Sequence, residues 1–236
     1  MKKLNGFYDS LNELEAIHFD LDGSLIQSES AWFESEIDLL REYGVEASVP
    51  AIRDITHDEL VGRGQKFAAR FYKENFGLAA PVEEIREKRI GLVKDYYKSV
   101  PLMEGADTVV RIFGESAVKV TLATSAPLEL AEIFLERKDY RNYFDHVVSD
   151  DDVGKSKPSP EIFLAAATGV GVEPKDSMVL EDSKNGVLAA ERAGTSCLWV
   201  PHEEYADKWK DLAEKADFIV DSLSELDLTE LRSRLI

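Results

Sequence analysis

Cysteine, long apolar runs and positive charge are all scarce in this chain of 236 residues. Cys197 is the single cysteine, so no disulfide can form within the chain, and its place in the apolar run 197–200 predicts a buried, unreactive thiol. No run approaches the roughly 18 apolar residues that a membrane-spanning helix needs, and no apolar stretch follows the lysines near the N-terminus. We therefore expect a cytoplasmic protein that has no membrane partner.

The charge balance is strongly acidic. There are 46 acidic residues against 28 basic ones, which gives a formal net charge of -18. Such a surface repels nucleic acid and anionic membranes, so we expect no nucleic-acid partner, and any phosphate site must be locally positive. Hydrophobic residues make up 44% of the chain, enough for a sizeable core. Nothing in the sequence indicates an obligate protein partner.

Short apolar runs alternate with longer amphipathic stretches along most of the chain. The runs that predict buried strands are 16–19, 118–123, 146–148, 178–180, 197–200 and 218–220. The stretches that predict helices are 105–113, 127–136, 160–168, 183–193 and 203–214. This alternation is typical of an α/β fold in which helices cover both faces of a parallel sheet. Ligands in such folds bind beyond the carboxyl ends of the strands.

Residues 28–100 break this rhythm, because no convincing strand occurs among them. Three segments, 29–43, 58–76 and 82–98, carry apolar residues at helical spacing. The glycines and prolines that separate them are Gly44, Pro50, Gly62, Gly64, Gly77 and Pro81. We therefore predict two domains: a discontinuous α/β core of residues 1–28 and 101–236, and an inserted all-helical domain of residues 29–100.

Two carboxylates follow the first predicted strand. Asp20 and Asp22 are two residues apart, so both side chains point to the same side of an extended chain. Such close carboxylates repel each other unless a cation or a shared proton lies between them, and a hard cation such as Mg²⁺ suits their oxygens. Gly23 then permits a sharp turn. Taken alone, the segment is explained equally well as a solvated turn that caps a helix.

Three more polar clusters occur at or after later strands. Thr124 and Ser125 precede a helix start, where hydroxyl and N–H groups can hold phosphate. Lys157 is fixed by the proline that follows it, and Glu181 and Asp182 leave the run 178–180. Each cluster alone is better explained as a helix cap or a solvated loop. Their joint occurrence at the strand ends of one sheet predicts a single active site.

Together these clusters resemble the four motifs of the haloacid dehalogenase superfamily, in particular its phosphatases and phosphomutases with a helical cap inserted after the first strand. The matching segments are FDLDGSL at 19–25, Thr124 with Ser125, SKPSPEIF at 156–163 and LEDSKNG at 180–186. The resemblance covers nearly the whole chain. It implies a Rossmann-like core, a cap domain formed by the insertion, Mg²⁺ as cofactor and hydrolysis of phosphoric monoesters.

The resemblance also implies roles for individual residues. Asp20 would be the nucleophile that forms an aspartyl phosphate. Asp22 would protonate the leaving oxygen and later activate water. Thr124 and the backbone of Ser125 would hold the phosphoryl oxygens, and Lys157 would neutralise both the nucleophile and the transferring group.

The implied metal site uses the same carboxylates. Asp20 and Asp182 would ligate Mg²⁺ together with the backbone carbonyl of Asp22, and Glu181 would act through a metal-bound water. Asn185 would face the cap or the substrate, or cap its own helix. Without the metal these acids would reject phosphate, so we expect strong chelation to abolish turnover.

The inserted domain offers weaker candidates. The segment 62–64 resembles the cap loop that leans over the active site in this subfamily, so Arg63 is either a substrate contact or a solvated arginine. Lys88 and Arg89 are further cap candidates. Trp32 stands approximately where β-phosphoglucomutase has a histidine, which disfavours a mutase and favours a buried cap tryptophan.

The leading functional prediction is a magnesium-dependent phosphatase acting on a small phosphorylated metabolite of the sugar or polyol phosphate class. A β-phosphoglucomutase-like phosphomutase is the first alternative, and a non-catalytic binding module is the second. The intact acids and Lys157 disfavour the module, because a binder has no use for a nucleophile beside a proton donor. They disfavour dehalogenation as well, because they suit a metal-bound phosphate better than a carbon–halogen bond.

Overall fold

A six-stranded sheet organises the computed structural model of this chain, which describes residues 3–46, 52, 59–202 and 208–236. The strand order is β3-β2-β1-β4-β5-β6, and all neighbouring strands are parallel. The strands are β1 (Ala16–Phe19), β2 (Lys119–Thr124), β3 (His146–Ser149), β4 (Ser177–Glu181), β5 (Ser196–Trp199) and β6 (Phe218–Ile219). Each lies within one residue of its predicted position, so the predicted parallel-sheet α/β fold is confirmed.

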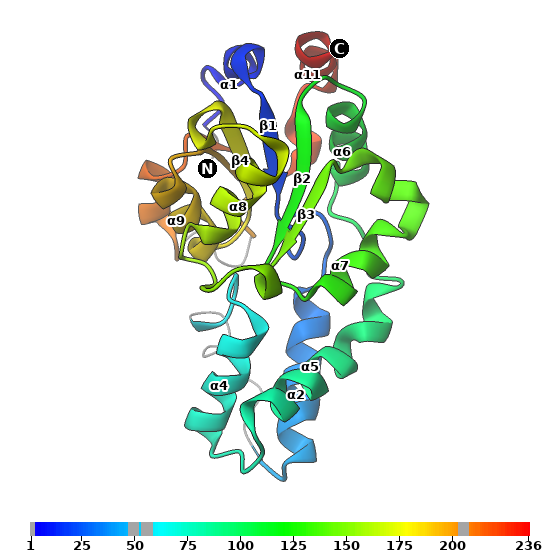
Figure 1. Ribbon diagram of the computed structural model, residues 1–236, viewed down its shortest axis with the longest axis vertical. Helices are drawn as coiled ribbons and strands as arrows, with labels where there is room; N and C mark the ends of the chain where they lie inside the picture. The colour runs from blue at the N-terminus through cyan, green and yellow to red at the C-terminus, as the bar shows by residue number, and fades with distance from the viewer. Residues whose placement is uncertain (1–2, 47–51, 53–58, 203–207) are drawn as a thin grey trace.

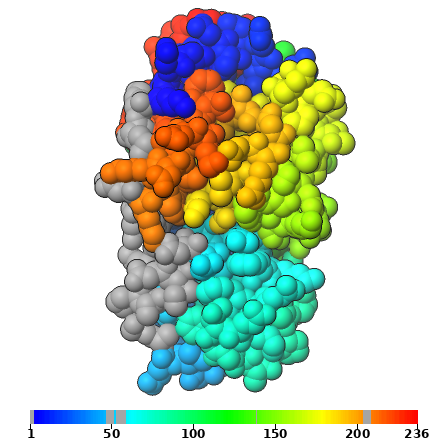
Figure 2. All heavy atoms as spheres, turned by 90° about the vertical axis from the view of Figure 1, so that its left-hand side faces the viewer, coloured from blue at the N-terminus to red at the C-terminus, as the bar shows by residue number. Residues whose placement is uncertain are grey.

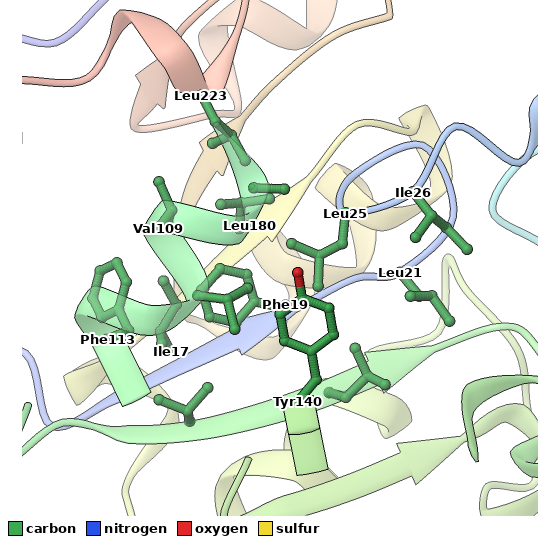
Figure 3. Close-up of a cluster of buried hydrophobic side chains, with 14 of the residues drawn as sticks. Ile17, Phe19, Leu21, Leu25, Ile26, Val109, Phe113, Tyr140, Leu180 and Leu223 are labelled. Atoms are coloured by element: carbon green, nitrogen blue, oxygen red, sulfur yellow. The ribbon is translucent and has the colours of Figure 1, made fainter. Parts of the chain in front are cut away.

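Helices cover both faces of this sheet (Figure 1). Alternate strand residues explain the two layers: Phe19 and Leu180 pack against α6 on one face, as Figure 3 shows, whereas Val179 faces α8 and α9 on the other. The first face carries α6 (Ala106–Gly114), α7 (Leu128–Leu135) and α11 (Leu228–Leu235), and the second carries α8 (Glu161–Val170) and α9 (Lys184–Ala193). Cys197 is buried in the second layer, as expected.

The remaining helical elements of the core are short. They are α1 (Phe7–Ser10), η1 (Leu11–Glu13), η2 (Arg137–Tyr143), η3 (Asp150–Asp152), η4 (Pro174–Asp176), η5 (Lys210–Glu214) and η6 (Leu223–Glu225). The helix predicted over 203–214 lies partly outside the described residues, and in its described part the helical residues are 210–214, which form the 3₁₀ helix η5 and not an α-helix. Trp209 and Leu212 are both buried, and their spacing of three residues places them on one side of a 3₁₀ turn.

Helices are the only regular secondary structure in the described part of residues 29–100, which we call the cap segment. They are α2 (Glu29–Glu42), α4 (Gln65–Phe76) and α5 (Val82–Tyr97), and they extend from the lower end of the sheet in Figure 1. Leu39, Ala69, Tyr72 and Ile85 belong to a hydrophobic cluster that this segment forms by itself. Figure 2 shows the cyan residues of the segment directly below the yellow and orange residues of the core.

The helix predicted over 58–76 is wrong over residues 60–64, which form a loop. Residue 58 lies outside the described residues, and α4 begins only at Gln65. Gly62 has a φ of 75° and Gly64 is extended, so neither continues a helix. The apolar residues Leu60 and Val61 fit helical spacing, but they lie in a loop that contacts the core through a hydrogen bond from Asn185 to the Val61 carbonyl.

Candidate active site

The polar clusters lie together at one edge of the sheet, at the carboxyl ends of its strands. Thr124 and Glu181 end β2 and β4, Asp20 and Asp182 directly follow β1 and β4, and Lys157 lies between η3 and α8. All five side chains are buried. Because β1 lies between β2 and β4, residues far apart in the sequence meet at this edge.

Lys157 is the charged centre of the site. Its Nζ lies 2.6 Å from Asp20 Oδ1 and 2.6 Å from Glu181 Oε1, and its side chain is 0% exposed. Burial alone would lower the pKa of Lys157, but the negative charges of Asp20 and Glu181 outweigh it and raise the pKa above its usual value. The lysine therefore stays protonated, and each carboxylate bonded to it has a fixed cation beside it.

Glu181 holds this arrangement in place. Its Oε2 accepts hydrogen bonds from the N–H groups of Asp182 (3.0 Å) and Ser183 (2.9 Å) and from the Ser183 hydroxyl (3.0 Å). A Cβ on Gly186 would lie 1.8 Å from Glu181 Oε1, so only glycine fits there. The carboxylate thus anchors both Lys157 and the turn into α9, a role that the sequence reasoning did not anticipate.

Three acids at this edge suit a divalent cation. Asp20, Glu181 and Asp182 each offer a carboxylate oxygen, and these oxygens lie within 4.8 Å of one another. Burial raises the pKa of Asp20 and of Asp182 well above their usual values, and the charge of Glu181 adds to both effects. Buried carboxylates that resist ionisation together are stabilised by a hard cation with oxygen ligands, so the donor set fits Mg²⁺.

Asp22 lies in a separate set of hydrogen bonds. Its Oδ1 accepts from the hydroxyls of Ser28 and Tyr97 and from Trp32 Nε1, which lies 3.1 Å away. Burial raises the pKa of Asp22, and these hydrogen bonds oppose the effect. Trp32 and Tyr97 belong to α2 and α5 of the cap segment, so the cap segment contributes directly to the environment of this acid.

Tyr97 was missed at the sequence level. It is one of several aromatic residues in a predicted helix, and nothing in its sequence neighbourhood distinguishes it from a core position. Trp32 was expected to be a buried cap tryptophan, but it is only partly buried and lines the pocket beside Asp22.

Two expected phosphate or substrate contacts face the cap segment. Ser125 Oγ donates to the carbonyl of Gly62 (3.0 Å), and Asn185 Nδ2 donates to the carbonyl of Val61 (2.8 Å). Thr124 Oγ1 accepts from the N–H of Ala126 (3.0 Å), so its hydroxyl stabilises the turn into α7. The side chains of Ser125 and Asn185 thus connect the core to the loop that precedes α4.

A pocket lies between this edge of the sheet and the cap segment. Its core wall includes Asp20, Asp22, Ser125 and Asp182, and its cap wall includes Trp32, Phe33, Glu36, Leu60, Arg63, Gln65 and Arg89. Two of the three basic cap candidates therefore reach the pocket. Lys88 does not line it and pairs with Glu42 at 2.7 Å.

The two arginines of the pocket have different surroundings. The Arg63 guanidinium lies 4.1 Å from the centroid of the Phe67 ring, and burial lowers the pKa of Arg63. Arg89 is buried and donates to Glu36 (2.9 Å) and Gln65. Both arginines line the cap end of the pocket, where a guanidinium group suits oxygen-rich ligands.

Comparison with known proteins agrees with this geometry. The family model described as haloacid dehalogenase-like hydrolase matches residues 14–194, which include all four polar clusters. The chain belongs to the haloacid dehalogenase-like hydrolases, as its motifs predict, and is an enzyme of the phosphoric monoester hydrolase type.

Several relatives are named phosphatases of phosphorylated sugars or polyols. Hexitol phosphatase B of Escherichia coli K12 is 31% identical over 223 residues, which cover 93% of this chain and 97% of that protein. The phosphorylated carbohydrates phosphatase of Thermotoga maritima is 33% identical over 183 residues, 77% and 82% of the two chains. A CbbY variant from Rhodobacter sphaeroides in complex with xylulose-1,5-bisphosphate has a TM-score of 0.78 at 25% identity, covering 92% and 99%. Sugar and polyol phosphatases are thus among the relatives of this enzyme.

Proposed function

We propose that this protein is a magnesium-dependent phosphatase that hydrolyses small sugar or polyol phosphates through an aspartyl phosphate on Asp20. One observation carries the proposal: Lys157 Nζ lies 2.6 Å from both Asp20 and Glu181, beside carboxylate oxygens of Asp20 and Asp182 that a single cation can share. Phosphoryl transfer needs mainly positioning and charge stabilisation, and this arrangement supplies a nucleophile, a fixed cation and metal ligands at one pocket.

The carboxylates of Asp20 and Asp182 would hold Mg²⁺, with the Asp22 carbonyl and a water on Glu181 as further ligands. When bound, the metal neutralises and orients the phosphoryl group. Lys157 keeps its own positive charge fixed next to the nucleophile, and the N–H groups around Ser125 at the start of α7 face the phosphoryl oxygens.

In the first half-reaction, a carboxylate oxygen of Asp20 attacks phosphorus while the bond from phosphorus to the leaving oxygen breaks. The electron pair of that bond stays on the leaving oxygen, which takes a proton from Asp22. Burial raises the pKa of Asp22, which favours the protonated acid needed here. The alcohol then leaves, and the phosphoryl group remains on Asp20.

In the second half-reaction, the ionised Asp22 takes a proton from a water molecule, and the water oxygen attacks phosphorus. The bond between phosphorus and Asp20 breaks, and its electron pair returns to the carboxylate. Inorganic phosphate leaves, with Asp20 ionised and Asp22 protonated, so the cycle can begin again.

The cap segment is proposed to choose the substrate. We propose two domains, a core of residues 1–28 and 101–236 and a cap domain of residues 29–100. Residues of both line the pocket. Arg63 and Arg89 offer donors to the hydroxyl groups of a polyol chain. The names of the hexitol phosphatase and of the carbohydrate phosphatase support this class of substrate.

The test is a screen of the purified protein with Mg²⁺ against hexitol phosphates, sugar phosphates and p-nitrophenyl phosphate. We expect release of inorganic phosphate, and a loss of about a thousandfold or more in kcat for Asp20→Asn while the variant stays folded. Asp95→Asn, at a carboxyl that is 89% exposed, is the matched control and should keep full activity.

Interconversion of sugar phosphate isomers that requires a bisphosphate primer, with no net release of phosphate, would instead indicate the mutase. A folded protein that binds these phosphates but converts none of them would indicate a binding module. Either result contradicts the proposed hydrolysis.

A further inference from the structure

The cap segment places two aromatic donors on the carboxylate that the proposed reaction uses as acid and base. We propose that Tyr97, together with Trp32, is a positioning residue that holds Asp22 Oδ1 and so directs Oδ2 to carry the exchanged proton. The inference rests on the proposed phosphatase function, and Tyr97 lies in none of the four motifs.

The contacts form a closed set. The Tyr97 hydroxyl donates to Asp22 Oδ1, and Trp32 Nε1 lies 3.1 Å from the same oxygen and 3.0 Å from the Tyr97 oxygen. The Trp32 and Tyr97 rings meet edge to face, with centroids 6.1 Å apart. The Ser28 hydroxyl also donates to Oδ1. Within the part of the chain that the structure describes, the hydrogen bonds to this carboxylate all end on Oδ1.

The chemistry of the donors determines which oxygen can carry the proton. An indole N–H can only donate, so Oδ1 must act as an acceptor while Trp32 is bonded to it. Three donors converge on Oδ1, and a carbonyl oxygen accepts hydrogen bonds better than a carboxyl O–H oxygen does, so protonated Asp22 carries its proton on Oδ2.

Burial and location support a positioning role. Tyr97 is fully buried, and it does not line the pocket, whereas Asp22 and Trp32 do. A buried tyrosine hydroxyl needs a hydrogen-bond partner, and here that partner is the acid itself. Tyr97 therefore acts through Asp22 and does not touch the substrate.

The donors also come from both ends of the cap segment. Ser28 and Trp32 lie where the chain leaves the core, and Tyr97 ends α5 just before the chain returns. The two crossings are joined, because the N–H of Gln27 donates to the carbonyl of Pro101 (2.8 Å). The orientation of Asp22 is thus set where both connections of the cap segment meet.

The positioning role requires that the exchanged proton leaves from and returns to Asp22 Oδ2. In the first half-reaction, the O–H bond at Asp22 Oδ2 breaks, and its proton joins the leaving oxygen, which keeps the electron pair of the broken bond to phosphorus. In the second half-reaction, Oδ2 takes a proton from the attacking water. Tyr97 and Trp32 keep their own protons throughout, so loss of Tyr97 affects only steps that need Asp22 to be aligned.

The experiment compares two substrates that differ in their need for an acid. An alkyl phosphate such as sorbitol 6-phosphate expels a poor leaving group that must be protonated, whereas p-nitrophenolate leaves without a proton. For Tyr97→Phe in the full chain with Mg²⁺, we expect kcat/KM on sorbitol 6-phosphate to fall about 10- to 100-fold, because a misaligned general acid loses part of its 10²–10⁴-fold contribution. We expect kcat/KM on p-nitrophenyl phosphate, which reports only the first half-reaction, to change less than about threefold.

Tyr140→Phe is the matched control. Tyr140 is equally buried and also donates its hydroxyl to a carboxylate, Asp107, but it lies outside the pocket. Its loss should lower the melting temperature and leave the ratio of the two rates unchanged. Trp32→Phe, which removes the second donor, should show the same selective loss as Tyr97→Phe and provides the test if Tyr97→Phe does not fold.

An equal loss of kcat/KM on both substrates, or no loss of kcat/KM on either, would overturn the positioning role. If the wild type releases phosphate from both esters and Tyr97→Phe keeps the wild-type ratio of the two rates, this inference alone is overturned. A wild-type protein that releases phosphate from neither ester would contradict the proposed function and this inference with it.

Discussion

Asp150 is a single carboxyl whose ionisation opposes folding. It starts η3, next to the loop of the cap segment, where a Cβ on Gly64 would lie 1.7 Å from its Oδ2. Burial raises the pKa of Asp150 to about 6 from an ordinary 3.8, and the charge of Asp151 adds to the effect, whereas a hydrogen bond from Ser156 opposes it. The folded protein then binds this proton more tightly than the unfolded chain does. Asp150 therefore lowers stability as the pH rises from about 4 to about 6.

Asp150→Asn removes this charge and keeps the shape of the side chain. We expect the free energy of unfolding at pH 7.5 to rise by on the order of 1 kcal/mol, a value reduced for solvent screening, because the variant no longer ionises a half-buried group. The gain should fade as the pH approaches 4, where the carboxyl is largely protonated in both states. Thermal or denaturant unfolding at the two pH values measures it.

The control for this measurement is Asp151→Asn. That carboxyl is 48% exposed and pairs with Arg86 at 2.6 Å, so its loss should give no gain in stability at pH 7.5. A difference between Asp150→Asn and wild type that is the same at both pH values would show that ionisation of Asp150 is not the cause.

At the scale of elements, the loop that precedes α4 joins the cap segment to the core. Its carbonyls at Val61 and Gly62 accept hydrogen bonds from Asn185 and Ser125. Gly62 adopts a φ of 75°, and a Cβ there would lie 2.4 Å from Ser183 Oγ. The loop can approach the start of α9 this closely only because it carries glycine at that position.

Gly62→Ala should therefore push this loop away from the active-site edge. We expect kcat/KM for an alkyl phosphate to fall about tenfold or more, since a small displacement of groups around the site is costly. Gly77→Ala is the matched control: Gly77 also has a positive φ, 66°, in the cap segment, but a Cβ there meets nothing within 4 Å.

Both variants carry a similar backbone strain, of about 1–2 kcal/mol, which thermal unfolding measures. Only Gly62→Ala adds a clash with the core. Equal kcat/KM values for the two variants would show that the contact between the loop and α9 has no part in activity.

At the scale of the whole molecule, the acidic surface and the acidic site would both repel an anionic substrate. The chain carries a net charge of -18, and its site combines Asp20, Asp22, Glu181 and Asp182 with Lys157. This excess of negative charge would repel a phosphate ester, and a bound divalent cation would offset the repulsion. None of the helices in the described ranges combines the length and apolar character of a membrane span. The cytoplasmic location and the absence of protein partners stay predictions from the sequence.

Removal of divalent metal should consequently abolish turnover. We expect excess EDTA to reduce phosphate release below detection and added Mg²⁺ to restore it. The melting temperature of the wild type should rise with Mg²⁺ concentration, because a ligand that binds only the folded state stabilises it. Asp182→Asn should lose most of this Mg²⁺-dependent rise. Undiminished activity in excess EDTA would contradict the metal requirement.

Much of this enzyme was determined by its sequence alone. Short, continuous apolar runs predicted the six strands of the described sheet. A parallel sheet that is buried on both faces requires such runs. Asp20, Asp182 and Lys157 could be assigned to one site because parallel strands must all end at the same edge. The cap helices α2 and α5 followed from helical spacing in the same way.

Only the tertiary structure decided how the cap segment meets this edge. The hydrogen bonds of Tyr97 and Trp32 to Asp22, and the approach of Gly62 to Ser183, join residues far apart in the chain whose local sequence resembles ordinary helix or loop. Periodicity records which side of an element is buried, but it does not record which distant atom that side contacts. That choice depends on how whole elements pack together, and it is at this level that Asp22 acquires its surroundings.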